Sequence, residues 1–219
     1  PAAPAAPPAA PGRPGGPIRI GSLGRLHPVK GYDVLIQALA RLQCGGFAPA
    51  RAYEVVIAGD GKERARLEAL ASGLGVRGIT FAGFQDRPRD FLAGLHLYLQ
   101  PSRSEGLCVA AHEAMQAGLP TLVSTVGELP KTVVDGETGL VVRPGDVEAL
   151  AHALTWFLGH PDRLAAFGAA ARHRVLDRFS AAAFRQAGTD ILKRMCAQPY
   201  GEVVAPGPEA VPRASGRSA

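Results

Sequence analysis

The feature that most constrains the fold of this chain is a regular alternation between short apolar runs and longer amphipathic segments. Leu35, Leu39 and Leu42, for example, share one face at helical spacing. We expect further helices over 63–74, 87–94 and 108–117, and a helical region from Val147 to about Met195. The apolar runs have the length and composition of strands and cover 18–23, 53–58, 79–81, 95–99, 122–124 and 139–142.

This alternation predicts an α/β fold, because strands that are apolar along their whole length must be covered on both faces. Strand–helix–strand units with right-handed crossovers give a doubly wound, Rossmann-like parallel sheet. Ligands of such sheets bind in the crevice beyond the carboxyl ends of the strands. A fold class names no function by itself, so the functional interpretation depends on the loops at those ends.

The two ends of the chain have compositions that do not form a core. Residues 1–17 are almost entirely Pro, Ala and Gly, which predicts an extended linker. Residues 198–219 are rich in Pro and Gly without apolar periodicity, which predicts a disordered tail. We therefore expect one folded domain over 18–197 of the 219 residues. The chain begins without Met and without a signal peptide, and we interpret it as a fragment of a longer protein.

Charge limits the classes of partner. The 24 basic residues are four Lys and twenty Arg, and the formal net charge is +5. The basic side chains are interspersed with acids, and no aromatic-rich strand pattern accompanies them, which argues against nucleic-acid binding. A modest positive charge is also suited to peripheral contact with an anionic membrane face.

Cysteine usage and hydropathy indicate the compartment. Cys44, Cys108 and Cys196 are far apart and form no C-x-x-C pair, as expected for a reducing environment. No apolar run approaches the roughly 18–20 residues of a membrane span. We predict a cytoplasmic protein, with the inner membrane face as the place of any peripheral contact.

The loop at 24–31 follows the first predicted strand and contains two cations, Arg25 and Lys30, between Gly24 and Gly31. A guanidinium and an ammonium at the beginning of a helix form a strong anion site, because the first helical turn carries partial positive charge. The alternative is a solvated loop that happens to be charged. Neither G-x-G-x-x-G nor a P-loop motif is present.

The loop at 101–108 leads into another helix and places Glu105 at its entry, with Glu113 eight residues later. Eight helical residues rise roughly 12 Å, about the reach from a hexose across a diphosphate to a ribose. One carboxylate could accept hydrogen bonds from sugar hydroxyls and the other from ribose hydroxyls. The alternative is that Glu105 is a capping charge and Glu113 an ordinary surface acid.

Taken together, these motifs resemble the family 4 (group 1) glycosyltransferases, which have the two-domain GT-B fold. The spacing from Glu105 to Glu113 is similar to the E-x7-E signature of retaining members. Six motifs occur in the family's order: G-R-L-x-x-x-K-G at 24–31, A-G-D-G at 58–61, F-x-G-F at 81–84, P-S-x-x-E-G at 101–106, E-A-M-x-A-G-x-P at 113–120 and D-G-x-T-G-L-V-V-x-P-G-D at 135–146.

The resemblance implies hexosyl transfer from a UDP- or GDP-type nucleotide sugar to an acceptor hydroxyl, with retention of the anomeric configuration. It implies that Arg25 and Lys30 stabilise the leaving diphosphate and that Glu105 holds the donor sugar. No protein nucleophile, metal or other cofactor is expected. The other donor-binding positions that it implies are Gly24, Gly83, Phe84, Gly106, Leu107, Cys108 and Glu113.

Three positions depart from the family's pattern. Cys108 stands where members usually have a glycine, and the usual G-G-x-P-E segment has Glu128 in place of a glycine and Lys131 in place of the acid. These changes could compensate one another, shift the donor preference, or mark decay of activity. We expect the thiol of Cys108 to be a small apolar filler rather than a reactive group.

The resemblance also implies a missing partner, because GT-B enzymes bind the acceptor mainly through an N-terminal domain. The expected acceptor is a glycan, a polysaccharide or a lipid-linked glycan, and the chain alone is expected to bind donor with little transfer. Two alternatives remain: a non-catalytic sugar-nucleotide-binding module, and a GT-B relative with other chemistry such as epimerisation.

Overall fold

The computed structural model describes residues 16–49 and 51–197. The chain divides into two compact units, Pro1–Ser180 and Ala181–Ala219. Apart from Gly16 and Pro17, the predicted linker at 1–17 and the predicted tail at 198–219 lie outside the described residues.

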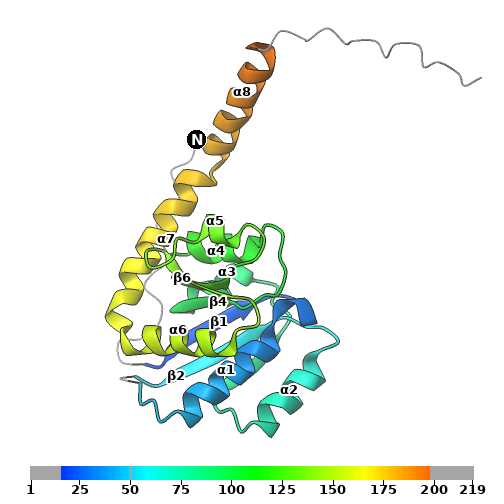
Figure 1. Cartoon of the computed structure of the whole chain (residues 1–219), viewed down its shortest axis with the longest axis vertical. Coiled ribbons are helices and arrows are strands. Elements are labelled where there is room, and N and C mark those ends of the chain that lie inside the picture. The colour runs from blue at the N-terminus through cyan, green and yellow to red at the C-terminus, as the bar shows by residue number, and fades with distance from the viewer. Residues whose placement is uncertain (1–15, 50, 198–219) are drawn as a thin grey trace, which may run out of the picture. The chain divides into compact units, whose positions relative to one another are not determined.

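The first unit is built on a parallel sheet, as predicted (Figure 1). The strands lie in the order β3-β2-β1-β4-β5-β6, and every neighbouring pair is parallel. Sequence order reverses between β1 and β4, which makes this the topological switch point of a Rossmann-like sheet. The strands are β1 (Ile18–Leu23), β2 (Tyr53–Ala58), β3 (Ile79–Gly83), β4 (Leu97–Gln100), β5 (Thr121–Ser124) and β6 (Gly139–Val142).

Helices cover both faces of the sheet and enclose two apolar clusters. One cluster lies under α1 (Tyr32–Cys44), α2 (Arg64–Gly73) and α6 (Val147–Gly159). The other lies under the helices α3 (Pro88–Ala93), α4 (Val109–Gln116), α5 (Leu129–Thr132) and part of α7 (Leu164–Arg178). Short 3-10 turns, η1 (Pro28–Lys30) and η2 (Pro161–Arg163), precede α1 and α7.

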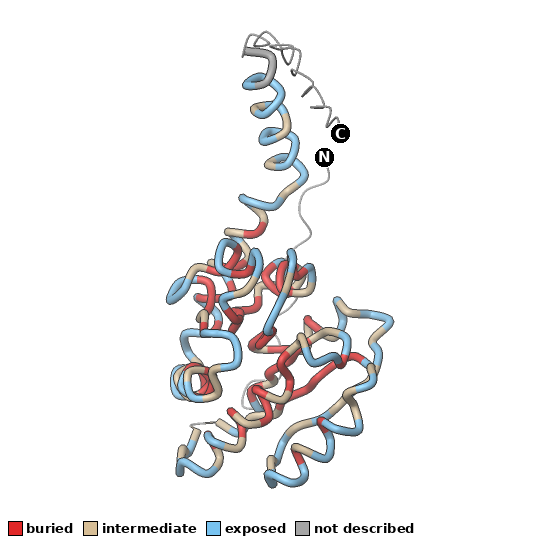
Figure 2. The backbone as a smooth tube through the Cα atoms, turned by 45° about the vertical axis from the view of Figure 1, so that its right-hand side comes forward, coloured by how far each residue is buried: buried red, intermediate tan, exposed pale blue. Residues whose placement is uncertain are grey.

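The core follows from the apolar spacing of the sequence. Leu35, Leu39 and Leu42 are all buried on the inner face of α1. In Figure 2 the buried positions concentrate along the strands and the inner sides of the helices. Truncating a leucine such as Leu39 to alanine typically costs about 2–5 kcal/mol of stability in such a core.

Three local predictions were wrong. The helical region from Val147 is interrupted at η2, because Pro161 has no backbone N–H to continue α6, and again at Phe179 and Ser180. The helix predicted over 63–74 ends at Gly73, and Leu74 beyond its end is exposed. The short helix α5 was not predicted.

The second unit contributes α8 (Ala181–Ala197), an amphipathic helix that exposes Phe184, Ile191 and Leu192. Over the described part of the chain, every helix is too short or too polar to cross a membrane.

Candidate functional site

The candidate site lies where β1 and β4 end, at the topological switch point. The loop at 24–31 follows β1 and the loop at 101–108 follows β4. The two loops are joined by a backbone hydrogen bond of 2.7 Å from Arg103 N to Val29 O. Gly31 has a φ of +68°, and a Cβ there would lie 2.0 Å from the carbonyl oxygen of Pro101, so only glycine permits this approach.

Lys30 and Glu105, one from each loop, form an ion pair. Lys30 Nζ lies 2.6 Å from Glu105 Oε1, and the two side chains are only 20% and 9% exposed. The same oxygen accepts hydrogen bonds from Ser102 Oγ at 2.6 Å and from Gln100 Nε2 at 3.0 Å. A carboxylate with three donors on one oxygen is held in a fixed orientation.

A hollow of about 640 Å³ opens beside this pair. Arg25 and Glu113 line it from different elements, and neither side chain makes an ion pair or hydrogen bond with another described residue. Both are therefore available to a ligand. The lining residues are Leu23, Gly24, Arg25, Ala58, Gly59, Asp60, Phe84, Gln85, Asp86, Pro88 and Glu113.

Gly24 connects the ion pair to the hollow. It lines the hollow, and a Cβ on Gly24 would lie 3.5 Å from Cε of Lys30. Lys30 therefore lies next to a lining residue of the hollow, although neither Lys30 nor Glu105 is itself a lining residue. The structure thus places the four predicted side chains as two pairs: Lys30 contacts Glu105, and Arg25 and Glu113 line one hollow.

The remaining predicted residues fall into two groups. Phe84 lines the hollow with its ring exposed, and Gly83 directly precedes it at the end of β3. Gly106, Leu107 and Cys108 belong to the loop at 101–108 but not to the lining of the hollow. Their backbone N–H groups make no hydrogen bonds to backbone acceptors in the described chain, at the entry to α4. Such amides are suited to an anionic or hydroxyl-bearing ligand.

Cys108 is a buried residue of this loop. It takes a left-handed conformation with φ of 52°, unusual for a residue other than glycine. Burial, reinforced by the negative charge of Glu105, raises the pKa of its thiol to about 11. The thiol thus packs with the apolar cluster beneath α4, in keeping with an apolar filler.

Glu128 and Lys131, the two other departures from the family's pattern, pair with each other. Lys131 Nζ lies 2.9 Å from Glu128 Oε1 at an exposed position. Glu128 N also donates to the carbonyl of Gly106 at 3.1 Å, so this segment contacts the loop that carries Glu105.

An interaction that the sequence did not indicate joins Arg103, in the loop at 101–108, to Asp33, in the first turn of α1. Arg103 contacts both carboxylate oxygens of Asp33, at 2.6 and 2.8 Å. Burial alone would raise the pKa of Asp33, but the hydrogen bonds and charge of Arg103 lower it below its usual value. The sequence signal was weak, since the two residues are 70 positions apart.

Sequence reasoning also missed Asp60 and Asp86, which line the hollow, and Gln100, which contacts Glu105. Asp60 belongs to the A-G-D-G motif at 58–61, but the motif gave it no individual role; a Cβ on the adjacent Gly59 would lie 1.9 Å from the carbonyl oxygen of Gly24. Gln100 is a buried polar residue at the end of β4, one residue beyond the strand predicted over 95–99.

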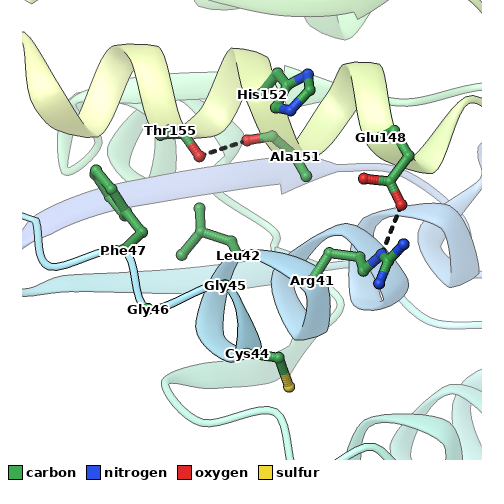
Figure 3. A pocket seen from close by; sticks show the side chains of 10 residues that line it. All are labelled: Arg41, Leu42, Cys44, Gly45, Gly46, Phe47, Glu148, Ala151, His152 and Thr155. Atoms are coloured by element: carbon green, nitrogen blue, oxygen red, sulfur yellow. Dashed lines mark hydrogen bonds and ion pairs between the residues drawn. The ribbon is translucent and has the colours of Figure 1, made fainter.

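Figure 3 shows a second hollow, of about 530 Å³, between the C-terminal end of α1 and α6. Arg41 and Glu148 pair at its edge at 2.6 Å, and His152 and Phe47 are among its lining residues. It contains none of the predicted site residues. In neither hollow, nor elsewhere in the described ranges, do three or more His, Cys, Asp or Glu side chains gather as metal ligands would.

Comparison with known proteins gives one family. The model described as "Glycosyl transferases group 1" matches residues 7–174 of the chain. The lipopolysaccharide core biosynthesis glycosyltransferase LpsE of Rhizobium meliloti (strain 1021) is 40% identical over 135 residues, which are 61% of this chain and 37% of that protein. A GDP-mannose-dependent phosphatidylinositol monomannoside mannosyltransferase of Mycolicibacterium smegmatis (strain ATCC 700084 / mc(2)155) is 36% identical over 72% of this chain and 43% of its own length. The chain thus spans less than half the length of these relatives.

Solved structures share the fold. Sucrose-phosphate synthase from Thermosynechococcus elongatus aligns with a TM-score of 0.70 and 28% identity, over 83% of this chain and 46% of that one. Anabaena HepE, solved in complex with UDP and glucose, aligns with a TM-score of 0.69 and 25% identity, over 81% of this chain and 48% of that one.

Proposed function

Because the chain belongs to the group 1 glycosyltransferase family, we propose that it is the donor-binding half of a retaining hexosyltransferase. Its substrate in this proposal is a UDP- or GDP-type nucleotide sugar. Curated and solved relatives named for GDP-mannose, or bound to UDP and glucose, support this substrate class.

The observation that carries the proposal is the convergence of four charged side chains at the switch point. Arg25 and Glu113 are unpaired within the described chain and line one hollow, while Lys30, next to the lining residue Gly24, pairs with Glu105. Two cations beside amides at a helix entry suit a diphosphate, and carboxylates on either side suit sugar and ribose hydroxyls.

Charge in the hollow favours one orientation of the donor. Its lining includes the carboxylates of Asp60, Asp86 and Glu113 but only one cation, Arg25. A diphosphate beside those acids would be repelled, so it must lie toward Arg25, Lys30 and the amides at 106–108. The ribose then lies toward Glu113 and the base toward Phe84, which can contact it through an exposed ring.

Transfer requires the glycosidic C–O bond to break and the diphosphate to leave with added negative charge. In the proposed mechanism Arg25 and Lys30 stabilise that charge, and Glu105 orients the sugar through its hydroxyls. The acceptor hydroxyl attacks the face from which the phosphate departs and passes its proton to the departing diphosphate oxygen, which retains the configuration. No protein nucleophile, metal or other cofactor takes part.

The matched stretch is less than half the length of the relatives named above, so the proposal extends to a partner domain. We propose an N-terminal GT-B domain that binds the acceptor, a glycan, polysaccharide or lipid-linked glycan. The proposed location is the cytoplasm, with peripheral contact at the inner membrane face.

Thermal unfolding in the presence of nucleotides tests the donor site. We expect UDP-glucose or GDP-mannose to raise the Tm of the chain, and saturation at 100 times Kd to add about 2.7 kcal/mol of stability. Glu113→Ala should lose at least ~10-fold in affinity, since the ribose hydroxyls lose a charged acceptor. Glu137→Ala, which removes an exposed carboxylate outside the hollow, is the matched control.

Two results would count against the proposal. One is a Tm unchanged by either nucleotide sugar; the other is an equal shift in Glu113→Ala and the control. Donor binding without any transfer by the longer protein would instead support the non-catalytic sugar-nucleotide-binding module.

A further inference from the structure

Gln100 is a buried polar residue that the proposed mechanism does not use. It is the last residue of β4, at the switch point, and its side chain is fully buried. A buried amide away from a ligand is costly unless both its oxygen and its nitrogen are hydrogen-bonded.

Both the oxygen and the nitrogen of the Gln100 amide are hydrogen-bonded to specific partners. Its Oε1 accepts a 2.6 Å hydrogen bond from the hydroxyl of Tyr98. Its Nε2 donates to Ser102 Oγ at 2.8 Å and to Glu105 Oε1 at 3.0 Å. Because an ionised carboxylate only accepts hydrogen bonds, the amide nitrogen must face Glu105 and the amide oxygen faces the Tyr98 hydroxyl.

This orientation determines how Glu105 is presented. Gln100, Ser102 and Lys30 all donate to the same oxygen, Oε1. That oxygen is committed to the protein, which leaves Oε2 for a ligand hydroxyl. A carboxylate held by three donors does not have to give up side-chain freedom when the ligand arrives.

We propose that Gln100 is a positioning residue for donor binding: anchored by Tyr98, its amide fixes Glu105 and, through Glu105, Lys30. This inference rests on the proposed function. It goes beyond the residues of the recognised motifs. In this proposal the hydrogen-bonded side chains Tyr98, Gln100, Glu105 and Lys30 act as one unit, which presents the sugar-binding and phosphate-binding groups together.

The ionisable neighbours of Gln100 define a clean test. Burial raises the pKa of Tyr32 to about 12 and that of Cys108 to about 11, and it raises the pKa of Tyr98 well above its usual value. All three are neutral between pH 5.5 and 8, so the charged groups facing this network are Glu105 and Lys30.

Gln100→Glu is the decisive variant. A protonated glutamic acid has nearly the shape of glutamine, and its O–H can replace the amide donor to Glu105. An ionised one places a second negative charge against Glu105, and burial raises the pKa at which this happens. We expect UDP-glucose or GDP-mannose to bind the variant within ~3-fold of wild type at pH 5.5 and at least ~10-fold more weakly at pH 8.

Gln100→Met separates positioning from packing. It keeps the volume but has no donor for Glu105, so we expect weakened binding at both pH values and no new pH dependence. The donor affinity of wild type across the same pH range is the reference, because wild type contains the same Glu105 and Lys30. Circular dichroism at each pH records whether each variant is folded.

The outcomes distinguish this inference from the proposed function. If wild type binds neither nucleotide sugar, the proposed function fails and this inference with it. If wild type binds but folded Gln100→Met binds as tightly as wild type at both pH values, Gln100 has no positioning role and the proposed function stands.

Discussion

Cys108 shows how a single residue departs from its family without introducing new chemistry. Its left-handed backbone would suit glycine, yet the side chain is buried in the cluster beneath α4. A non-glycine residue in this conformation costs on the order of 1–2 kcal/mol, which burial of the thiol partly offsets. The raised pKa follows from the same burial.

We expect Cys108 to resist alkylation in the folded chain. Iodoacetamide at pH 8 reacts with thiolates, and a thiol with a pKa of about 11 supplies few of them. Cys44 is exposed and is the internal control. Peptide mapping by mass spectrometry should find Cys44 modified first and Cys108 modified only in urea. Equal rates for the two in the native state would show that the loop at 101–108 opens freely.

Single residues also mark the limit of prediction from sequence. The sequence identifies Arg25, Lys30, Glu105 and Glu113 as candidates because ordered motifs contain them. Gln100 could not be identified in this way, because its role depends on a hydroxyl and a carboxylate that only the fold brings within 3.0 Å.

At the scale of elements, the loops at 24–31 and 101–108 behave as one unit. The carboxylate of Asp33, in the first turn of α1, accepts hydrogen bonds from both terminal nitrogens of Arg103. One of these nitrogens, NH1, also donates to Pro28 O at 3.1 Å. The pair helps to fix the distance between Lys30 and Glu105, although neither of its members lines the hollow.

We expect a double-mutant cycle of Asp33→Asn and Arg103→Ala to give a coupling of about 0.5–1 kcal/mol at pH 7, modest because Arg103 is 41% exposed. The lowered pKa of Asp33 means that this stability is present above the unfolded value near ~3.9 and is lost as the pH falls through the lower folded value. Urea unfolding of the four proteins of the cycle, at pH 7 and at lower pH values, measures this coupling free energy.

The more exposed pair Arg41–Glu148 is the control cycle, and its coupling should be smaller. A coupling that is no larger for Asp33–Arg103, or that grows as the pH falls below 4, would contradict the bidentate ion pair.

Elements were predictable where local pattern and tertiary packing agree. β1, β2 and β6 have the predicted bounds because each apolar run is flanked by polar or turn-forming residues. α5 was missed because four residues carry no periodicity. Pro161 indicated a break between α6 and α7, but the apolar residues on either side of it favoured one continuous helix.

At the scale of the whole molecule, the order of apolar runs was sufficient to predict the doubly wound sheet, and the sheet determines where the loops meet. The pairing of Lys30 with Glu105 across the switch point follows from that topology rather than from either loop alone. What the sequence could not predict is which side chains each carboxylate would contact, since those partners come from different strands and loops.

The most direct test is to locate the bound donor by hydrogen exchange of the full chain with UDP-glucose or GDP-mannose. We expect slower exchange of the backbone amides at 24–31, 83–86 and 106–109, around the hollow at the switch point. Protection at 41–47 and 148–155 instead, around the second hollow of Figure 3, would contradict the assignment of the donor site.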